Sequence, residues 1–131
     1  MGDKTKDLHD TFASRCDPAY SYAALPLSVY DGDTLRLNID LGFGIWRRST
    51  KIRMWGINTP ELRGEDKEAG KAARDFLRNL LFDGGEPKPV TLYSIKDRTG
   101  KYGRYLGILV KDGKIINEEL IKAGHAVPMI Y

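Results

Sequence analysis

The chain has 131 residues, of which 41% are hydrophobic and 30% charged, and its formal net charge is +3 at pH 7. These values fit one soluble globular domain whose core needs no disulfides. Cys16 is the only cysteine, which excludes an internal disulfide and a thiol-rich metal cluster. The mild positive charge is compatible with nucleic acid but does not require it.

The N-terminal part of the chain carries no clear structural pattern. Residues 1–19 are polar and aperiodic, so we expect an irregular lead-in followed by one domain over residues 20–131. The first twenty residues lack the apolar segment of a secretory signal, and no run approaches the ~18 apolar residues typical of a membrane span. We therefore expect no membrane association and a cytoplasmic location, unless a signal was removed. A monomer is the expected oligomeric state.

Two strands are expected at the start of the domain. Residues 20–29 are apolar and rich in aromatic side chains, which favours a strand, and the following Asp-Gly pair predicts a turn. Residues 34–41 alternate strictly between apolar and polar side chains, the clearest strand pattern in the chain. The Gly-Phe-Gly sequence at 42–44 then interrupts this pattern.

The next segment is expected to be a hairpin tip followed by a returning strand. Residues 45–50 are predicted to form a long tip, and residues 51–57 the returning strand, which Pro60 ends. Trp46 and the arginines beside it suggest two readings: the indole stacks on a nucleic-acid base, or it packs on the barrel as a hydrophobic lid.

Residues 66–82 are predicted to form an amphipathic helix, with Asp66 as its N-cap and Gly84 as its C-terminal stop. We assign this helix a structural role only. Its predicted apolar face has helical spacing and consists of Ala69, Ala72, Ala73, Phe76, Leu77, Leu80 and Leu81.

Two further strands, at 90–95 and 105–110, are separated by a charged loop. Asn117 is predicted to cap a short helix that ends at Gly124, and His125 is interpreted as structural. Five strands with a helix inserted after the third predict a β-barrel with helices (α+β) of the OB-fold type.

Two polar corners delimit the predicted hairpin. Asp31-Gly32-Asp33-Thr34 opens it, and Asn58-Thr59-Pro60-Glu61 follows its returning strand. If the hairpin folds back, these corners meet and bring Arg53 with them. Carboxylate and other oxygen groups suit a hard cation. A cation, a carboxylate base and a guanidinium are the groups that cleavage of a phosphodiester requires.

Four segments occur in a characteristic order along the chain. They are Asp31-Gly32-Asp33-Thr34, Arg53 with Asn58-Thr59-Pro60-Glu61, Lys101-Tyr102-Gly103-Arg104, and Asp112-Gly113-Lys114 with Asn117-Glu118. In the order and approximate spacing of these motifs, the chain resembles the staphylococcal nuclease (thermonuclease) family over about residues 25–125.

The resemblance implies a calcium-dependent endonuclease that acts on DNA and RNA with little sequence preference and leaves 3′-phosphate ends. It implies Ca²⁺ ligands at Asp33, Asn58 and Thr59, and a general base or water-orienting acid at Glu61. It further implies guanidiniums on the scissile phosphate at Arg53 and Arg104, and substrate contacts at Lys101, Tyr102 and Tyr131.

Three departures from the family pattern are expected to matter. Asn58 stands where the best-studied members have an acid, so metal affinity should fall. The hairpin tip is longer than in those members, and the chain stops at Tyr131, where the resemblance implies a further segment. The alternative function is a non-catalytic OB-fold module that binds single-stranded nucleic acid, or a protein partner anchored by Trp46.

Overall fold

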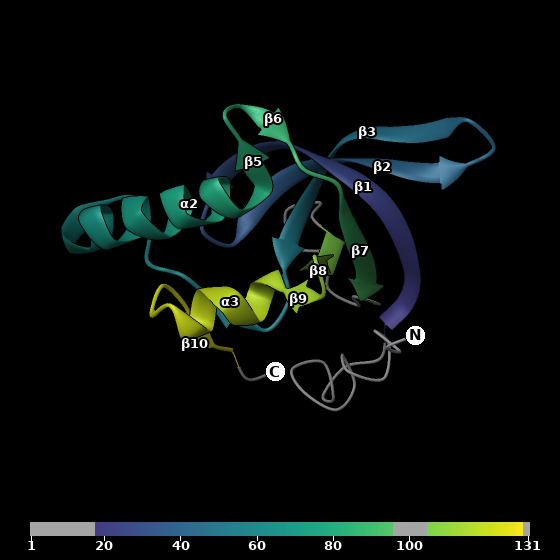
Figure 1. Cartoon of the computed structure of the whole chain (residues 1–131). Helices are drawn as coiled ribbons and strands as arrows, with labels where there is room; N and C mark the ends of the chain where they lie inside the picture. The colour runs from purple at the N-terminus through teal and green to yellow at the C-terminus, as the bar shows by residue number, and fades with distance from the viewer. Residues whose placement is uncertain (1–17, 96–104, 130–131) are drawn as a thin grey trace.

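A closed barrel of five strands forms the body of the molecule (Figure 1). The structure is a computed structural model that describes residues 18–95 and 105–129. The strands run in the order β3-β2-β1-β7-β8, and β3 also pairs with β8 in parallel, which closes the sheet. They are β1 (Pro18–Asp31), β2 (Thr34–Gly42), β3 (Ile45–Met54), β7 (Val90–Ile95) and β8 (Tyr105–Lys111). The predicted OB-type barrel with helices is confirmed.

Shorter elements decorate the barrel. The α2 helix (Lys67–Leu81) follows a 3-10 turn, η2 (Gly64–Asp66), and packs against β1, while α3 (Ile116–Lys122) packs against β8. The remaining elements are β4 (Ile57–Asn58) paired with β10 (Val127–Pro128), β5 (Phe82–Asp83) paired with β6 (Glu86–Pro87), and β9 (Lys114–Ile115). No helix of the described part of the chain is long and apolar enough to cross a membrane.

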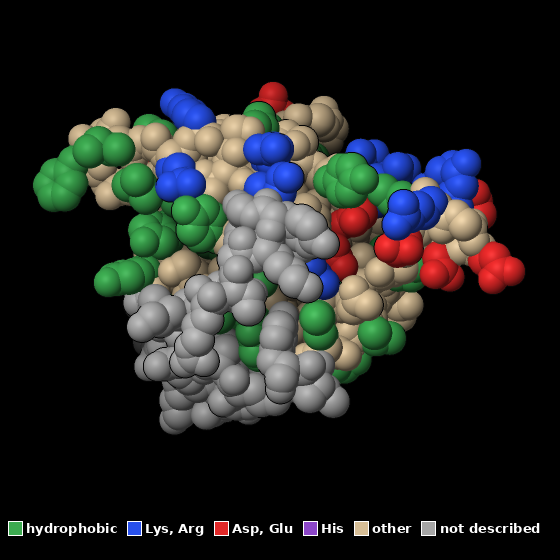
Figure 2. Space-filling view, turned by 180° about the vertical axis from the view of Figure 1, so that it is seen from behind, with side chains coloured by type: hydrophobic (Ala, Val, Ile, Leu, Met, Phe, Trp, Pro, Cys, Tyr) green, Lys and Arg blue, Asp and Glu red, His purple; other side chains and the backbone are tan. Residues whose placement is uncertain are grey.

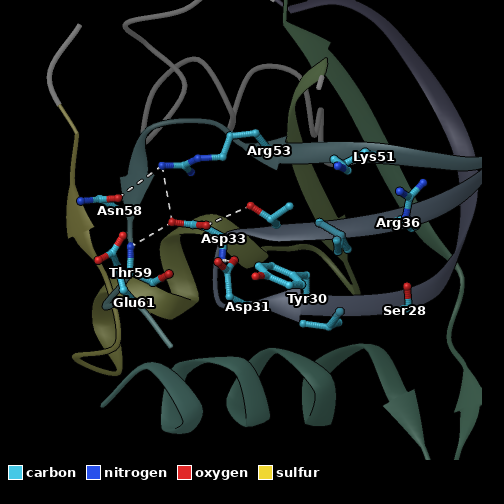
Figure 3. A pocket seen from close by; sticks show the side chains of 13 residues that line it. Ser28, Tyr30, Asp31, Asp33, Arg36, Lys51, Arg53, Asn58, Thr59 and Glu61 are labelled. Atoms are coloured by element: carbon cyan, nitrogen blue, oxygen red, sulfur yellow. Dashed lines mark hydrogen bonds and ion pairs between the residues drawn. The ribbon is translucent and has the colours of Figure 1, made fainter. Parts of the chain in front are cut away.

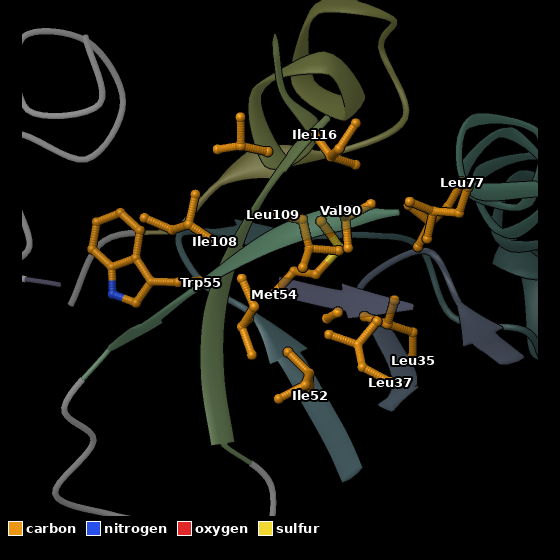
Figure 4. Packing of buried hydrophobic residues seen from close by; sticks show 14 of the residues in the cluster. Leu35, Leu37, Ile52, Met54, Trp55, Leu77, Val90, Ile108, Leu109 and Ile116 are labelled. Carbon is orange, nitrogen blue, oxygen red and sulfur yellow. The ribbon is translucent and has the colours of Figure 1, made fainter. Parts of the chain in front are cut away.

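The core fills the barrel and continues beneath α2 (Figure 4). Leu35, Leu37 and Ile39 of β2 are buried, and the residues between them lie on the outer side of the sheet. This is the period of two that the sequence shows. Leu77 and Leu81 of α2 are fully buried on the same core. Burial of these side chains is the main source of stability of the fold.

The hairpin between β2 and β3 differs from the prediction. Residues 45–50 are not a loop, because β3 already begins at Ile45, and the turn itself lies at Phe43 and Gly44, both with positive φ. Register shifts on the β2–β3 pairing, together with a positive φ at Ser49, break the alternation that would have marked a strand. The result is a long two-stranded hairpin that extends beyond the barrel (Figure 1).

The boundaries of α2 were predicted closely, but the residues predicted to cap the helix and to form its buried face were partly wrong. Asp66 holds the N-cap position of α2, yet its side chain makes no capping hydrogen bond. Gly84 belongs to the turn between β5 and β6 rather than to the end of the helix. Ala69 and Ala72 are exposed, and Gly70 is buried in their place.

Asn117 is not a helix cap, which corrects the prediction. The α3 helix begins at Ile116, and the side chain of Asn117 is fully buried. Its Oδ1 accepts a hydrogen bond from the Leu109 N–H at 3.0 Å, and its Nδ2 donates to the carbonyls of Trp55 at 2.9 Å and Gly107 at 3.2 Å. An amide that both donates and accepts therefore joins α3 to two barrel segments.

Candidate functional site

A cleft of about 790 Å³ lies on the outer face of β1, β2 and β3, where the two polar corners meet (Figure 3). Asp31 and Asp33 lie on its floor, and Asn58, Thr59 and Glu61 lie along one side. The structure therefore brings together the two corners that the sequence predicted, with Arg53 beside them.

Asp33 is buried, with only 6% of the residue exposed, and both of its carboxylate oxygens have partners. Its Oδ1 accepts a hydrogen bond from Thr34 Oγ1 at 3.1 Å, and its Oδ2 accepts one from the Thr59 N–H at 3.1 Å. The Arg53 Nη2 lies 3.4 Å from the same Oδ2. These contacts fix the orientation of the carboxylate and link the first corner to the second.

Arg53 is anchored by the main chain of the second corner. Its Nη1 donates to the carbonyls of Met54 at 2.9 Å and Ile57 at 3.0 Å, and its Nη2 lies 3.4 Å from Asn58 Oδ1. Because Nη1 is bound to the main chain, Nη2 is the end of the guanidinium that faces the Asp33 carboxylate. A planar guanidinium held in this way is preorganised for an anion in the cleft.

Asp31 lies in the predicted turn, but no functional role was predicted for it. Its Oδ1 accepts a hydrogen bond from the Asp33 N–H at 3.1 Å. Burial, followed by the neighbouring carboxyl of Asp33, raises the pKa of Asp31 from 3.8 to about 6, although the Asp33 N–H and the Arg53 charge oppose this rise. Two crowded carboxylates of this kind favour binding of a positive charge.

Thr59 offers an oxygen without a partner. The residue is 8% exposed, and its buried Oγ1 has no hydrogen-bond partner among the described residues. A buried unsatisfied hydroxyl in a native fold calls for an explanation such as a bound ion or water. Asn58 is exposed, and its Oδ1 faces the Arg53 guanidinium.

The residues present fit a hard divalent cation. The Asp33 and Asp31 carboxylates and the Thr59 hydroxyl are all oxygen donors, the class that Ca²⁺ prefers, and the unpaired Thr59 Oγ1 is the observation that supports a ligand here. Over residues 18–95 and 105–129, no group of three or more His, Cys, Asp or Glu side chains converges on a metal position. A bound ion would therefore draw further oxygens from the main chain, from Asn58 or from water.

Glu61 lies at the rim rather than on the floor. Its side chain is 69% exposed and lies 3.8 Å from Arg63 Nε, in a weak ion pair. It lines both the main cleft and a neighbouring hollow of about 430 Å³ that reaches His125. The His125 ring itself packs 4.7 Å from the Phe76 ring, in keeping with a structural role.

Two glycines allow the corners to approach α2. A Cβ at Gly32 would lie 2.8 Å from the Ala73 Cβ and 2.8 Å from the Thr59 Cγ2. A Cβ at Gly70 would overlap the main-chain carbonyl of Glu61. The helix therefore supports both corners directly, a role that its amphipathic pattern did not predict.

Four of the predicted site residues, Lys101, Tyr102, Arg104 and Tyr131, lie outside the described residues. Arg36 and Lys51, two cations without a predicted role, also line the cleft. They face each other across β2 and β3, and the polar positions of the alternating β2 pattern would have revealed the first.

Comparisons with known proteins point to one family. The profile of the family described as staphylococcal nuclease homologue matches residues 51–131. Two proteins of Oryza sativa subsp. japonica, named probable staphylococcal-like nucleases CAN2 and CAN3, are 34% and 33% identical over 79 residues. An uncharacterized protein of Bacillus anthracis is 32% identical over 105 residues.

The matches cover different shares of the chains. Each rice match takes in 60% of this chain and 19% of the relative, and the Bacillus match takes in 77% of this chain and 44% of the relative. The chain therefore spans less than half the length of these three relatives.

Proposed function

Because the chain belongs to the staphylococcal nuclease family, we propose that it is a nuclease that hydrolyses phosphodiester bonds in nucleic acid. The observation that carries this proposal is the contact between Asp33 and Arg53 on the floor of an oxygen-lined cleft. A fixed carboxylate and a fixed guanidinium side by side suit a site that receives a cation and a phosphate together.

The proposed cofactor is Ca²⁺, held by Asp33, Asn58 and Thr59, with Asp31 close by. When bound, the ion supplies neutralisation of a phosphate oxygen and orientation of the scissile group. The unpaired Thr59 Oγ1 and the raised pKa of Asp31 support a cation at this position.

The remaining chemistry falls to the side chains of the cleft. Arg53 binds a non-bridging phosphate oxygen through Nη2, and its charge stabilises the pentacovalent phosphorus. Glu61 accepts a proton from the attacking water, whose oxygen bonds to phosphorus as the P–O5′ bond breaks. The departing O5′ takes up a proton from solvent water. The exposed carboxylate at the rim leaves room for a water molecule and a strand. The products are a 3′-phosphate and a 5′-hydroxyl end.

The substrate is proposed to be both DNA and RNA, cleaved internally with little sequence preference. The cations along the cleft, Arg36, Lys51 and Arg53, address the phosphate backbone that all nucleic acids share. Arg104, Lys101 and Tyr102 keep their proposed roles as the second guanidinium and as contacts to a neighbouring phosphate, and Tyr131 as a base-stacking group.

The test is plasmid and RNA cleavage with Ca²⁺, other divalent metals or chelator. Arg53→Ala, Glu61→Ala and Arg104→Ala should lose cleavage by ~100-fold or more, the loss typical of one oxyanion-stabilising group. Circular dichroism should report an intact fold. Lys114→Ala removes an exposed cation on β9, away from the cleft, and serves as the matched control. Full activity in Arg104→Ala would refute the second guanidinium.

The second candidate is a module that binds nucleic acid without cleaving it. The uncharged Asn58 at a corner proposed to bind metal favours this reading. No cleavage in any divalent metal, with oligonucleotide binding retained, would establish it in place of the nuclease.

A further inference from the structure

The outer part of the β2–β3 hairpin takes no part in closing the barrel. It extends past the barrel (Figure 1), and Figure 2 shows hydrophobic side chains at its free end with Lys and Arg side chains nearer the barrel. Phe43 at the tip is fully exposed, at 102% of its reference area. The cleft that receives the scissile phosphate opens onto the outer face of the same two strands.

Strand register shows which side chains share this outer face. Directly opposed residues on antiparallel strands point to the same side of the sheet. Three opposed pairs lie along the face, beginning at the cleft: Thr34 with Arg53, Arg36 with Lys51, and Asp40 with Trp46. The intervening Leu35, Leu37 and Ile39 of β2 point into the core. On β2 the face continues through Asn38 to Asp40, and on β3 it crosses the bulge at Arg48 and Ser49 before it reaches Trp46.

Most charged groups on this face are cationic. Arg36 is held in place by donating from Nη1 to the Ser49 carbonyl at 2.8 Å. The Arg48 guanidinium lies 5.1 Å over the ring of Trp46. Asp40 is the exception, and its Oδ1 accepts a hydrogen bond from the Gly42 N–H at 2.8 Å within the turn.

We propose that Arg36, Lys51, Arg48 and Trp46 form a second nucleic-acid subsite, which binds the strand on one side of the bond that is cleaved. This inference rests on the proposed function. The cations bind successive phosphates, and the indole with its guanidinium neighbour stacks on a base. At a rise of ~3.4 Å per residue, the six or seven steps from Arg53 to Trp46 span roughly 20 Å. That span suits several nucleotides, within the ~4–16 nucleotides that OB folds bind.

Two features of the hairpin face favour a nucleic-acid strand over other ligands: the face adjoins the cleft, and most of its charged side chains are cationic. The apolar residues of the tip, Leu41, Phe43 and Ile45, are exposed and would also suit a lipid surface or a second copy of the chain. Neither of these explains why the cationic row begins at the phosphate site and ends on an aromatic ring. Both become outcomes of the test.

The test compares a twelve-nucleotide single strand with a dinucleotide, each bound to the full chain in excess chelator. Tryptophan fluorescence reports the subsite, because Trp55, the other tryptophan, is buried in the core. The twelve-mer should quench the fluorescence of Trp46, and Trp46→Leu should abolish this quenching and weaken twelve-mer binding by about 5-fold or more.

The salt dependence of binding tests the cationic part of the subsite. Arg48→Ala should lower the slope of log K against log salt by about 0.7. Both variants should bind the dinucleotide as the parent does, and Lys114→Ala should match the parent throughout.

Three results would overturn the inference. The first is equal twelve-mer affinity and salt slope in the parent, Trp46→Leu and Arg48→Ala. The second is binding to phosphatidylserine vesicles that Phe43→Ser abolishes, with twelve-mer binding unaffected by Trp46→Leu. The third is a concentration-dependent dimer that Phe43→Ser dissociates, again with unaffected twelve-mer binding. Trp46-dependent binding without cleavage in any metal would instead refute the proposed function and support the subsite.

Discussion

Asp33 determines the geometry of the cleft at the scale of single residues, because three separate groups fix its two oxygens. Thr34 holds Oδ1, while the Thr59 N–H and the Arg53 guanidinium hold Oδ2. The same contacts tie the opening corner of the hairpin to the corner that follows β3. A ligand bound by this carboxylate therefore meets a site whose two halves are already aligned.

Asn58 is the position where a single change should strengthen metal binding. Its Oδ1 already faces Arg53, so Asn58→Asp adds a negative charge with little change of shape. Ca²⁺ is held by oxygen charge and geometry, and we expect roughly tenfold tighter binding. Activity should then saturate at lower Ca²⁺, while the maximal rate need not rise. Calorimetric titration and Ca²⁺-dependent cleavage measure the two effects, and unchanged Ca²⁺ affinity would exclude Asn58 as a ligand.

Asp31 should make the metal-free protein sensitive to pH. Its folded pKa, raised to about 6 by burial and by Asp33, lies above its ordinary value of 3.8. The group therefore contributes stability that is fully present below about pH 4 and is lost as pH rises through 6. In chelator, Asp31→Asn should exceed the parent in unfolding free energy by about 1 kcal/mol at pH 7, a modest gain because the side chain is partly exposed.

Urea unfolding at pH 4 and pH 7 measures this difference. At pH 4 the Asp31→Asn variant and the parent should be nearly equal, since both carry a neutral group. Glu65→Gln removes an exposed carboxylate and should show no such change between the two pH values. A gain for Asp31→Asn that is equal at both pH values would contradict the assignment.

At the scale of elements, α2 acts as the support against which both corners rest. Gly32 approaches Ala73, and Gly70 lies under the Glu61 carbonyl. The amphipathic pattern predicted the helix and its apolar side but not these contacts, because they depend on which turn of the helix faces the corners. Leu77 and Leu81 then fix the helix on the barrel.

Gly70→Ala tests this support. In a free helix the change should stabilise by up to ~1 kcal/mol, because Ala is the better helix former. Here the added Cβ must displace the Glu61 main chain. We expect lower stability and at least about tenfold slower cleavage, since small displacements of positioned groups are costly. The control is Ala69→Gly, at an exposed neighbouring position. It should lower helix stability by up to ~1 kcal/mol, through helix propensity alone, and leave cleavage intact. A more stable and fully active Gly70→Ala would refute the supporting role.

The sequence predicted the elements whose signals are local. Alternation over residues 34–41 marked β2, and the turn residues of the two corners marked where they lie. It did not predict the strand character of residues 45–50, because bulges in the β2–β3 pairing disturb the period of two. It also left Asp31 without a role, since the rise in its pKa depends on burial that only the folded chain creates.

At the scale of the whole molecule, the helices and the hairpin occupy different sides of the barrel (Figure 1). The cleft lies on the barrel between them: its two corners pack against α2, and its β2 and β3 residues continue into the hairpin. The chain also returns to the site at its other end, because β10 pairs with β4 and the Met129 N–H donates to the Gly56 carbonyl at 2.8 Å. Distant parts of the sequence therefore hold the second corner in place.

Asn117 joins these parts and provides the last prediction. A helix cap and a buried bridge both suit Asn, which is why the sequence pattern indicated the wrong one. Its side chain bonds Leu109 and Gly107 on β8 and Trp55 beside the second corner. Asn117→Ala removes an acceptor and two donors from a fully buried position. The free energy of unfolding should fall by about 3 kcal/mol, since each lost buried partner costs ~1–3 kcal/mol.

Thermal unfolding measures this loss as a drop in Tm of roughly 10 °C for a domain of this size. Asn117→Asp separates the bridge from simple packing, because it keeps the volume and the acceptor but cannot donate to the Trp55 and Gly107 carbonyls when ionised. It should destabilise at pH 7 at least as much as Asn117→Ala, since it places a charge against two carbonyl oxygens in a buried position. Asn79→Ala, an exposed Asn on α2, should change Tm little. If Asn117→Asp melted with the parent at pH 7, the two donated bonds would contribute nothing, and α3 would be held to the barrel by its apolar residues alone.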